Sequence, residues 1–305
     1  MKRPTLLVIH QGALGDFVLL LPFLIALKKS YYIGVFCKKE NTKVANYFKA
    51  VDKAFAIESS IFSSIFLDTP DDSIKDIIQG FEKILIFSFS IEIKNSIQRI
   101  AKKGSKIFLI PPRPKPDKRI HVADHIKDSL IKIGLLEEEL KGLQTAINPS
   151  GITIIHPGAG SKRKRWDIKG FLKLFYMLKS EKISSTFLLG PAEEDLIAYF
   201  EDIKDNLFIT DDIYQVIGLL KSARGFIGND SGISHLSGFM GIPTLTIFGP
   251  SDPIRWKPRG RKVTVLRGTK ACSPCFEIEK ENCQNPVCLD IEPDLVFKEY
   301  RKLIS

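Results

Sequence analysis

The chain has 305 residues, of which 44% are hydrophobic and 26% charged, as in a soluble globular protein long enough for two domains. Lysine and arginine outnumber aspartate and glutamate by 45 to 35, and the net charge of +10 favours anionic partners: nucleic acid, phosphorylated sugars or an acidic membrane surface. No segment reaches the roughly 18 uninterrupted apolar residues of a membrane span, which excludes a helical membrane protein.

The first half of the chain alternates short apolar runs with helical patterns. Strands separated by helices form parallel units that are covered on both faces, so these strands lack polar alternation. A Pro-rich basic loop, PPRPKPDKR, occupies residues 111–119, and residues 145–151 mark a break. We expect strands at residues 6–9, 32–37, 53–57, 84–89 and 106–110, with helices that include 15–29, 41–49 and 122–135.

The same alternation begins again after this break. A last helix at residues 292–304 could pack on either half. The simplest architecture is α/β, with two Rossmann-like halves in tandem. In the second half we expect strands at 152–157, 185–190, 225–228 and 244–248, and helices at 168–180, from Ala192, at 212–221 and after Gly232.

The first of three strand-to-helix turns is HQGALGDF, residues 10–17, which interrupts the most apolar part of the chain. Gly12 and Gly15 allow the backbone to approach a ligand, and the helix start favours an anion. Asp16 stands at the C-terminal end of the first strand, the edge where open α/β sheets bind ligands. The alternative for Asp16 is a carboxylate that only complements the helix dipole.

Two further turns of this kind lie in the second half. HPGAGSKRKRWD, residues 156–167, joins a glycine turn to a basic run that suits a pyrophosphate, with a solvated charge run as the alternative. In residues 228–252, Asp230, Ser231 and Gly232 open a helix whose N–H groups could hold phosphate, with His235 one turn later. Helix capping and a satisfied buried histidine are the alternatives there. Three such turns in one chain favour a ligand site.

The motifs taken together resemble a known family. GALGD at the first turn, HPGAGS followed by KRW, LGPAEE at residues 189–194 and the 228–252 segment are similar to the ADP-heptose:lipopolysaccharide heptosyltransferases, the inverting GT-B glycosyltransferases of family 9. The resemblance weakens between residues 38 and 145. It implies two Rossmann-like domains facing a cleft: an acceptor-binding domain at 1–148 and a nucleotide-sugar-binding domain at 149–305, with the terminal helix able to pack back on the first.

The resemblance also implies roles for particular residues. Asp16 matches the base that deprotonates the acceptor hydroxyl, and Lys164 matches the lysine that contacts the donor phosphates. Either Glu193 or Glu194 falls where the family has an acid near the nucleoside. The donor-binding set is completed by Gly158, Ala159, Gly160, Asp230, Ser231, Gly232 and His235.

The implied donor is ADP-heptose, and the implied acceptor is an anionic, lipid-linked core oligosaccharide of lipopolysaccharide. On the acceptor side we expect Gly12, Gly15, Arg113 and Lys115. No small-x-small cleavage site follows the basic and apolar N-terminus, so we expect a cytoplasmic protein in peripheral contact with the inner membrane surface. The rivals are a same-fold transferase with another nucleotide sugar or acceptor, and a basic nucleic-acid-binding protein. The chain lacks a recognised nucleic-acid motif, which argues against the nucleic-acid-binding rival, so no nucleic-acid partner is expected.

Two patterns bear on metals and cofactors. No two aspartates are two residues apart, so the D-x-D metal site of many other glycosyltransferases is absent and catalysis is expected to need no cofactor. The four crowded cysteines have the count for a structural zinc site, with reduced or partly oxidised thiols as the alternative. They are Cys272, Cys275, Cys283 and Cys288.

Overall fold

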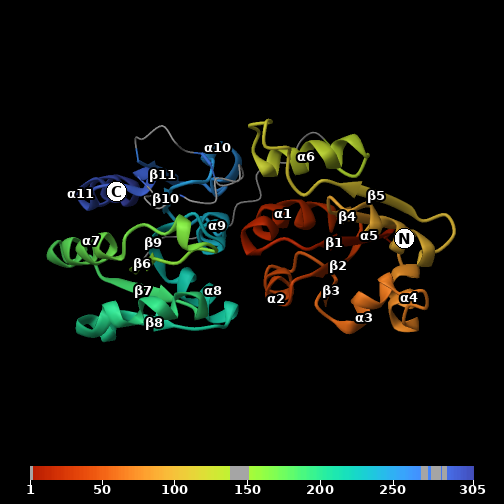
Figure 1. Ribbon diagram of the computed structural model, residues 1–305, viewed down its shortest axis with the longest axis horizontal. Helices are drawn as coiled ribbons and strands as arrows, with labels where there is room; N and C mark the ends of the chain where they lie inside the picture. The colour runs from red at the N-terminus through yellow and green to blue at the C-terminus, as the bar shows by residue number, and fades with distance from the viewer. Residues whose placement is uncertain (1–2, 138–150, 269–273, 276–282, 284–286) are drawn as a thin grey trace. The chain divides into compact units, whose positions relative to one another are not determined.

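The computed structural model describes residues 3–137, 151–268, 274–275, 283 and 287–305. The chain divides into two compact units, Met1–Leu143 and Gln144–Ser305 (Figure 1). Each unit has a parallel sheet with helices around it, which confirms the expected α/β class. The expected boundary between residues 148 and 149 falls outside the described residues.

The first unit is built on a sheet whose described strands run in the order β3-β2-β1-β4-β5. Strand β1 lies at the centre and is buried after its first residue, because helices cover both faces of a parallel sheet. The strands are β1 (Thr5–His10), β2 (Tyr32–Cys37), β3 (Lys53–Ala56), β4 (Lys83–Phe87) and β5 (Lys106–Ile110). The helices are α1 (Leu14–Leu27), α2 (Lys39–Tyr47), α3 (Ser60–Ser63), α4 (Asp72–Gln79), α5 (Ile91–Ile100) and α6 (Val122–Lys132), with a 3-10 turn η1 (Ser64–Phe66).

The second unit repeats this plan, with its described strands in the order β11-β10-β9-β6-β7-β8. The strands are β6 (Ile152–His156), β7 (Ser185–Leu189), β8 (Leu207–Ile209), β9 (Ala223–Asn229), β10 (Thr244–Phe248) and β11 (Val263–Arg267). The α-helices are α7 (Ile168–Ser180), α8 (Ile213–Lys221), α9 (Gly232–Phe239), α10 (Pro253–Trp256) and α11 (Pro293–Ile304). The 3-10 segments are η2 (Lys162–Lys164), η3 (Pro191–Asn206) and η4 (Val287–Leu289).

The α-helix expected from Ala192 is wrong. The chain there forms 3-10 turns, and Phe200 and Ile203 have non-helical dihedral angles. Both side chains are buried. Strands β8 and β11 were not expected; β8 has only three residues, too few to show an apolar pattern. Within the described residues, no helix is both long and apolar enough to cross a membrane.

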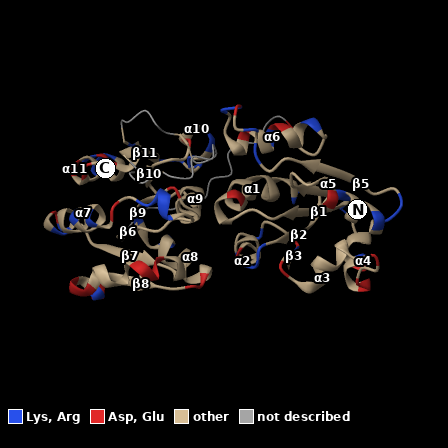
Figure 2. Cartoon of the chain, viewed as in Figure 1, with Lys and Arg blue, Asp and Glu red and all other residues tan. Residues whose placement is uncertain are grey.

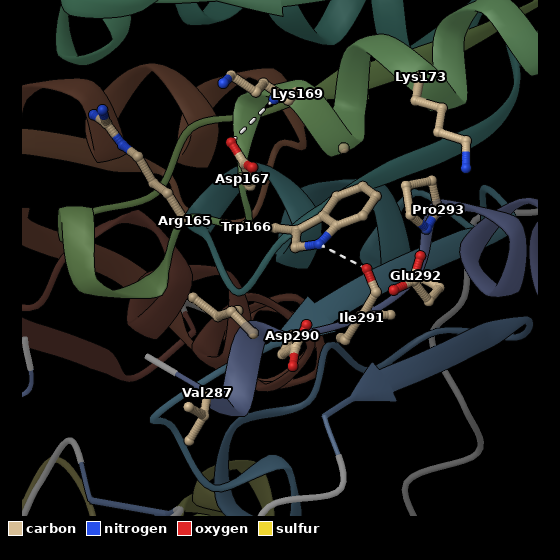
Figure 3. A pocket seen from close by; sticks show the side chains of 12 residues that line it. Arg165, Trp166, Asp167, Lys169, Lys173, Val287, Asp290, Ile291, Glu292 and Pro293 are labelled. Carbon is tan, nitrogen blue, oxygen red and sulfur yellow. Dashed lines mark hydrogen bonds between the residues drawn. The ribbon is translucent and has the colours of Figure 1, made fainter. Parts of the chain in front are cut away.

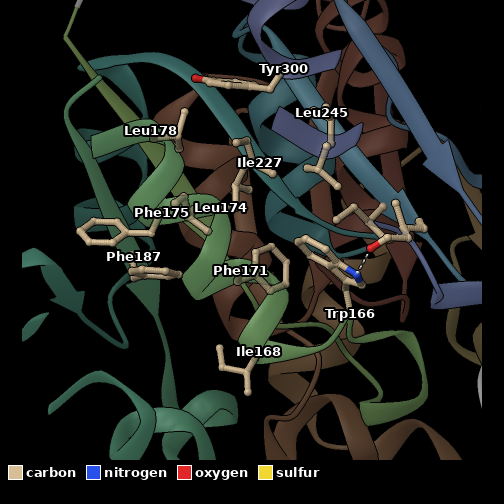
Figure 4. Packing of buried hydrophobic residues seen from close by; sticks show 14 of the residues in the cluster. Trp166, Ile168, Phe171, Leu174, Phe175, Leu178, Phe187, Ile227, Leu245 and Tyr300 are labelled. Carbon is tan, nitrogen blue, oxygen red and sulfur yellow. Dashed lines mark hydrogen bonds between the residues drawn. The ribbon is translucent and has the colours of Figure 1, made fainter. Parts of the chain in front are cut away.

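The C-terminal helix packs on the second of the two halves. Val296 and Tyr300 of α11 belong to the same buried cluster as Phe171 of α7 and Phe187 of β7 (Figure 4). The Tyr300 hydroxyl lies 2.7 Å from Thr153 Oγ1 in β6. Burial raises the pKa of Tyr300 far above its ordinary value, so the hydroxyl stays protonated. The helix is therefore part of the second unit's core.

We expect the loss of the Tyr300 hydroxyl to destabilise the second unit. Tyr300→Phe removes the partner of a buried Thr153 hydroxyl, which costs about 1 to 3 kcal/mol. Adding Thr153→Val should recover part of this loss, because neither hydroxyl then remains to be satisfied. Urea unfolding of both single variants and the double variant measures the coupling. Simply additive losses would contradict a direct bond between the two hydroxyls.

A buried histidine ends β1 directly before the glycine turn of the first unit. The His10 side chain is 2% exposed and packs against the rings of Phe17 and Phe87, with centroids 5.6 and 5.8 Å away. Burial lowers the pKa of His10 to about 4, so the imidazole is neutral at pH 7. A Cβ on Gly12 would lie 2.6 Å from His10 Cε1 and 2.7 Å from Asp16 Cβ. The turn closes in this way only with glycine at position 12.

This imidazole predicts a loss of stability in acid. The pKa of His10 falls from 6.5 to about 4 on folding, so the unfolded chain binds the proton first as the pH drops. The free energy of unfolding is therefore unaffected by protonation of His10 above pH 6.5. It falls by on the order of 3 kcal/mol as the pH drops from 6.5 to about 4. His10→Gln should therefore show a smaller drop in melting temperature between pH 7 and pH 5 than the wild type. Equal drops would contradict the prediction.

Candidate active site

The first half-site is the turn between β1 and α1. Ala13 is the N-cap of α1, and its backbone N–H donates to Asp16 Oδ2 at 3.2 Å. The side-chain amide of Asn41 donates to the Gly12 carbonyl at 3.2 Å and ties the turn to α2. Gly15 is the second residue of α1. Asp16 is partly buried and caps the helix through this bond, and its role as a base stays a prediction.

The acceptor-side residues expected from the sequence lie at the same edge of the first sheet. Strand β1 pairs with β4, and β4 with β5, all in parallel, so their carboxyl ends meet at one edge. Arg113 and Lys115 lie in the loop that follows β5, and both are exposed. The strand order therefore brings this basic loop and the Asp16 turn to one edge, with the end of β4 between them. Figure 2 colours the lysine, arginine, aspartate and glutamate positions along the chain.

The second half-site joins the segments that follow β6 and β9. Lys164 Nζ donates to Asp230 Oδ2 at 2.8 Å, and the Asp230 side chain is only 5% exposed. Ser231 is the N-cap of α9, where its hydroxyl accepts from the Ser234 N–H, and its role toward a donor stays a prediction. Gly232 is the first residue of α9. The charged pair therefore lies directly before a helix N-terminus.

Asn229, which the sequence analysis missed, holds this half-site together. Its side-chain amide donates to the carbonyls of Pro157 and Gly158 at 2.8 and 3.4 Å. Its Oδ1 accepts from the Trp166 backbone N–H at 2.9 Å. One buried amide thus ties both ends of the glycine-rich basic segment to the end of β9. An asparagine at the end of a buried strand was the available signal, since a buried amide needs partners.

Glu193, rather than Glu194, is built into the second half-site. Glu193 is 4% exposed, whereas Glu194 is exposed. The Gly190 N–H donates to Glu193 Oε2 at 2.9 Å. A Cβ on Gly158 would overlap the Glu193 carboxylate, so the turn needs glycine at position 158. Burial lowers the pKa of His156, the last residue of β6, and the charge of Glu193 opposes that shift.

Ion pairs and hydrogen bonds join the basic run at residues 162–165 to η3. Lys162 Nζ lies 2.7 Å and Arg165 Nη1 3.0 Å from the Asp195 carboxylate. Arg165 also donates to the Ala192 carbonyl. Hydrogen bonds from Lys162 and Arg165 lower the pKa of Asp195 below its ordinary value. Within this run, Lys162 and Arg165 bind protein carboxylates on η3, while Lys164 reaches the half-site.

The remaining donor candidates differ in exposure. Ala159 is buried, while Gly160 is exposed beside it. His235 lies in α9 and is 4% exposed. Hydrogen bonds and ion pairs join Gly158, Lys164, Glu193 and Asp230 to neighbouring segments of the second unit, while Ser231 caps its own helix.

The cysteine set lies partly outside the described residues. Cys272 is not described, Cys275 and Cys288 are buried, and Cys283 is exposed. Among the residues that the structure does describe, no group of three or more His, Cys, Asp or Glu side chains could hold a metal ion. The zinc site needs Cys272, so it stays a prediction.

A pocket of about 680 Å³ opens between the start of α7 and residues 287–293 (Figure 3). Trp166 lines it and donates from Nε1 to the Ile291 carbonyl at 3.2 Å. Lys169, Lys173 and Glu292 give the pocket wall charges of both signs. No residue of the expected donor set lines it, so we keep the candidate site on the strand-to-helix loops.

Comparison with known sequences supports one family. The sequence model of glycosyltransferase family 9 (heptosyltransferase) matches residues 124–285. The chain is 26% identical to lipooligosaccharide heptosyltransferase 2 of Campylobacter jejuni over 318 aligned positions, which cover 95% of this chain and 96% of that protein. It is 24% identical to lipooligosaccharide heptosyltransferase 2 of Haemophilus ducreyi, over 63% of this chain and 59% of the relative.

Solved structures agree with this family. A glycosyltransferase family 9 structure from Veillonella parvula has a TM-score of 0.77 at 18% identity and covers 100% of this chain, with 98% of its own length matched. The E. coli heptosyltransferase WaaC with ADP has a TM-score of 0.72 at 14% identity, over 99% of this chain and 100% of that one. At such identities the likeness shows the fold, which is GT-B. The sequence match extends beyond half of the chain, and the protein therefore belongs to glycosyltransferase family 9, the heptosyltransferases.

Proposed function

We propose that this enzyme transfers heptose from ADP-heptose to an anionic acceptor of the lipopolysaccharide core, with inversion at the anomeric carbon. The similarity to lipooligosaccharide heptosyltransferase 2 supports a core oligosaccharide as the acceptor. The similar structure of E. coli heptosyltransferase WaaC with ADP-2-deoxy-2-fluoro heptose supports ADP-heptose as the donor. The observation that carries the proposal is the Lys164 ammonium, 2.8 Å from the buried Asp230 carboxylate that directly precedes the N-cap of α9. A cation and the N–H groups of a helix start both stabilise a diphosphate.

The proposed reaction assigns one role to each half-site. Asp16 takes the proton of the acceptor hydroxyl while that oxygen attacks the anomeric carbon of heptose. The bond from this carbon to the phosphate oxygen breaks, and ADP leaves with the bonding electrons. Lys164 and the N–H groups at the start of α9 offset the charge that grows on the diphosphate. Attack opposite the leaving group inverts the anomeric centre.

The proposal includes no catalytic cofactor, since the sequence lacks a D-x-D site. A zinc ion held by the cysteine set would be structural. Because the proposed acceptor is lipid-linked, we propose that the enzyme works at the cytoplasmic face of the inner membrane, in peripheral contact with it. Nucleic acid plays no part in this proposal.

The donor assignment is tested by ligand-induced stabilisation. Only a ligand that binds the folded state raises the melting temperature, so ADP-heptose and ADP should raise it in a panel of nucleotide sugars. Lys164→Met should weaken both shifts and lower the transfer rate by about 10² to 10³. If a different nucleotide sugar raised the melting temperature and ADP-heptose did not, the donor assignment would be wrong and that sugar would take its place.

Two variants separate binding from folding in this test. Lys164→Met also takes the partner from a buried carboxylate, which lowers stability by itself. In the double variant Lys164→Met, Asp230→Asn this charge is gone, so the melting temperature should recover while ADP affinity does not. Lys179→Met removes an exposed charge at the other end of α7 and should change neither quantity.

Asp16→Asn tests the base. Asparagine keeps an oxygen for the Ala13 N–H, so the fold and ADP affinity should be retained, while turnover falls by about 10² to 10⁴. Had Asp16 only capped α1, the change would cost about 0.3 to 1 kcal/mol of stability and little activity. The matched control is Asp124→Asn, which removes a first-turn carboxylate from α6. Normal turnover of Asp16→Asn would defeat the catalytic role.

A further inference from the structure

We propose that Phe89, Ile91 and Arg113 form a platform that binds an anionic sugar of the acceptor, so that the acceptor is recognised by an aromatic face as well as by charge. This inference rests on the proposed function and specifies how its acceptor is held. Phe89 and Ile91 expose apolar side chains to water just beyond the end of β4.

Phe89 has the most exposed side chain among the large apolar residues that the structure describes, at 62%. Ile91 follows two positions later and is 54% exposed. A single exposed apolar side chain is ordinary, but two together beside a functional edge are typical of a binding surface.

The backbone around Phe89 is tied on both sides, so a loose loop does not explain the exposure. The Ser88 N–H donates to the Ile110 carbonyl at 3.0 Å, which joins the ends of β4 and β5. Ser88 Oγ accepts from the Ser90 N–H at 3.0 Å, and Ser90 Oγ caps α5 by accepting from the Glu92 N–H at 3.2 Å. The loop therefore holds the ring outward.

Arg113 supplies the charge beside the ring. Its guanidinium carbon lies 5.7 Å from the Phe89 ring centroid, within cation–π range. An exposed guanidinium offers a planar fork of N–H donors that matches a carboxylate or a phosphate. Lys115, Lys118 and Arg119 are exposed in the same loop and add positive charge. A ligand for this surface needs a flat apolar face and an anionic substituent next to it.

A sugar ring with a carboxylate or phosphate has this chemistry, because its C–H face is apolar and its anion lies at the ring edge. The platform also lies in the right place. In the register of the sheet, Phe87 at the end of β4 pairs with His10 at the end of β1. Neighbouring strands lie about 4.8 Å apart, so one sheet edge presents both the Asp16 turn and the platform to a single oligosaccharide.

The experiment uses the full-length protein and a deacylated, phosphorylated lipopolysaccharide core oligosaccharide, with binding measured by calorimetry in the absence of donor. Phe89→Ala and Arg113→Gln should each weaken binding by about three- to tenfold. Because both side chains contact one sugar, the double variant should lose less than the product of the two factors. In transfer assays the acceptor KM should rise while kcat and the donor KM stay unchanged.

Two control variants match the size of each change. Phe66→Ala removes another exposed ring of the first unit, 51% exposed in η1, and Lys103→Gln removes an exposed charge before β5, at the opposite edge of the sheet. Neither should alter oligosaccharide binding. An oligosaccharide whose phosphates are removed and whose sugar carboxylates are reduced should lose most of its dependence on Arg113, and ADP affinity should be the same in every variant.

Unchanged oligosaccharide affinity in Phe89→Ala and Arg113→Gln would overturn the platform, as would a wild type that does not bind the oligosaccharide. If the two variants lost binding to phosphatidylglycerol vesicles but kept normal oligosaccharide affinity, the platform would also be overturned. The surface would then be a membrane contact. The proposed function fails separately, if oligosaccharide binding depends on the platform but no heptose is transferred from ADP-heptose.

Discussion

The candidate site of the second unit depends on the hydrogen bonds of one buried amide. Asn229 cannot leave its side chain unsatisfied inside the protein without a large loss of free energy. It satisfies that side chain with the backbone of Pro157, Gly158 and Trp166, and so joins the end of β9 to a segment that starts at β6. Lys164 lies inside the joined segment and Asp230 directly follows Asn229, so the same amide sets the distance between the two charges.

The two units close their glycine turns in the same way. Each turn follows a central strand that ends in a buried histidine, His10 or His156, whose pKa is lowered by burial. Two residues later comes a glycine whose Cβ would meet the histidine Cε1, at 2.6 Å for Gly12 and 2.7 Å for Gly158. A carboxylate, Asp16 or Glu193, packs on the other side of each glycine. Both turns therefore combine a neutral ring with an acid, and in the proposed function they serve different substrates.

The sequence predicted the features that depend on local pattern. The strand at 32–37 and the helix at 168–180 have the bounds of β2 and α7, because apolar runs and helical periodicity are local properties. Tertiary contacts decided the rest. Glu193 and Glu194 have the same chemistry, and only packing behind Gly158 distinguishes them. The role of Asn229 was hidden because its partners lie 63 to 72 positions earlier in the chain. Segment 191–206 forms 3-10 turns with non-helical dihedral angles at Phe200 and Ile203, a departure that its local helical pattern does not reveal.

The central place of β1 has a consequence for synthesis on the ribosome. Leu6 pairs with Ile33 on one side and with Lys83 on the other, so the second neighbour of β1 is made long after β1 itself. Chain growth at about 5 to 20 residues per second leaves a delay of several seconds. During that time the apolar segment 6–9 has one open hydrogen-bonding edge, and such edges promote aggregation. We therefore expect the nascent chain to depend on chaperones most strongly at its own first strand.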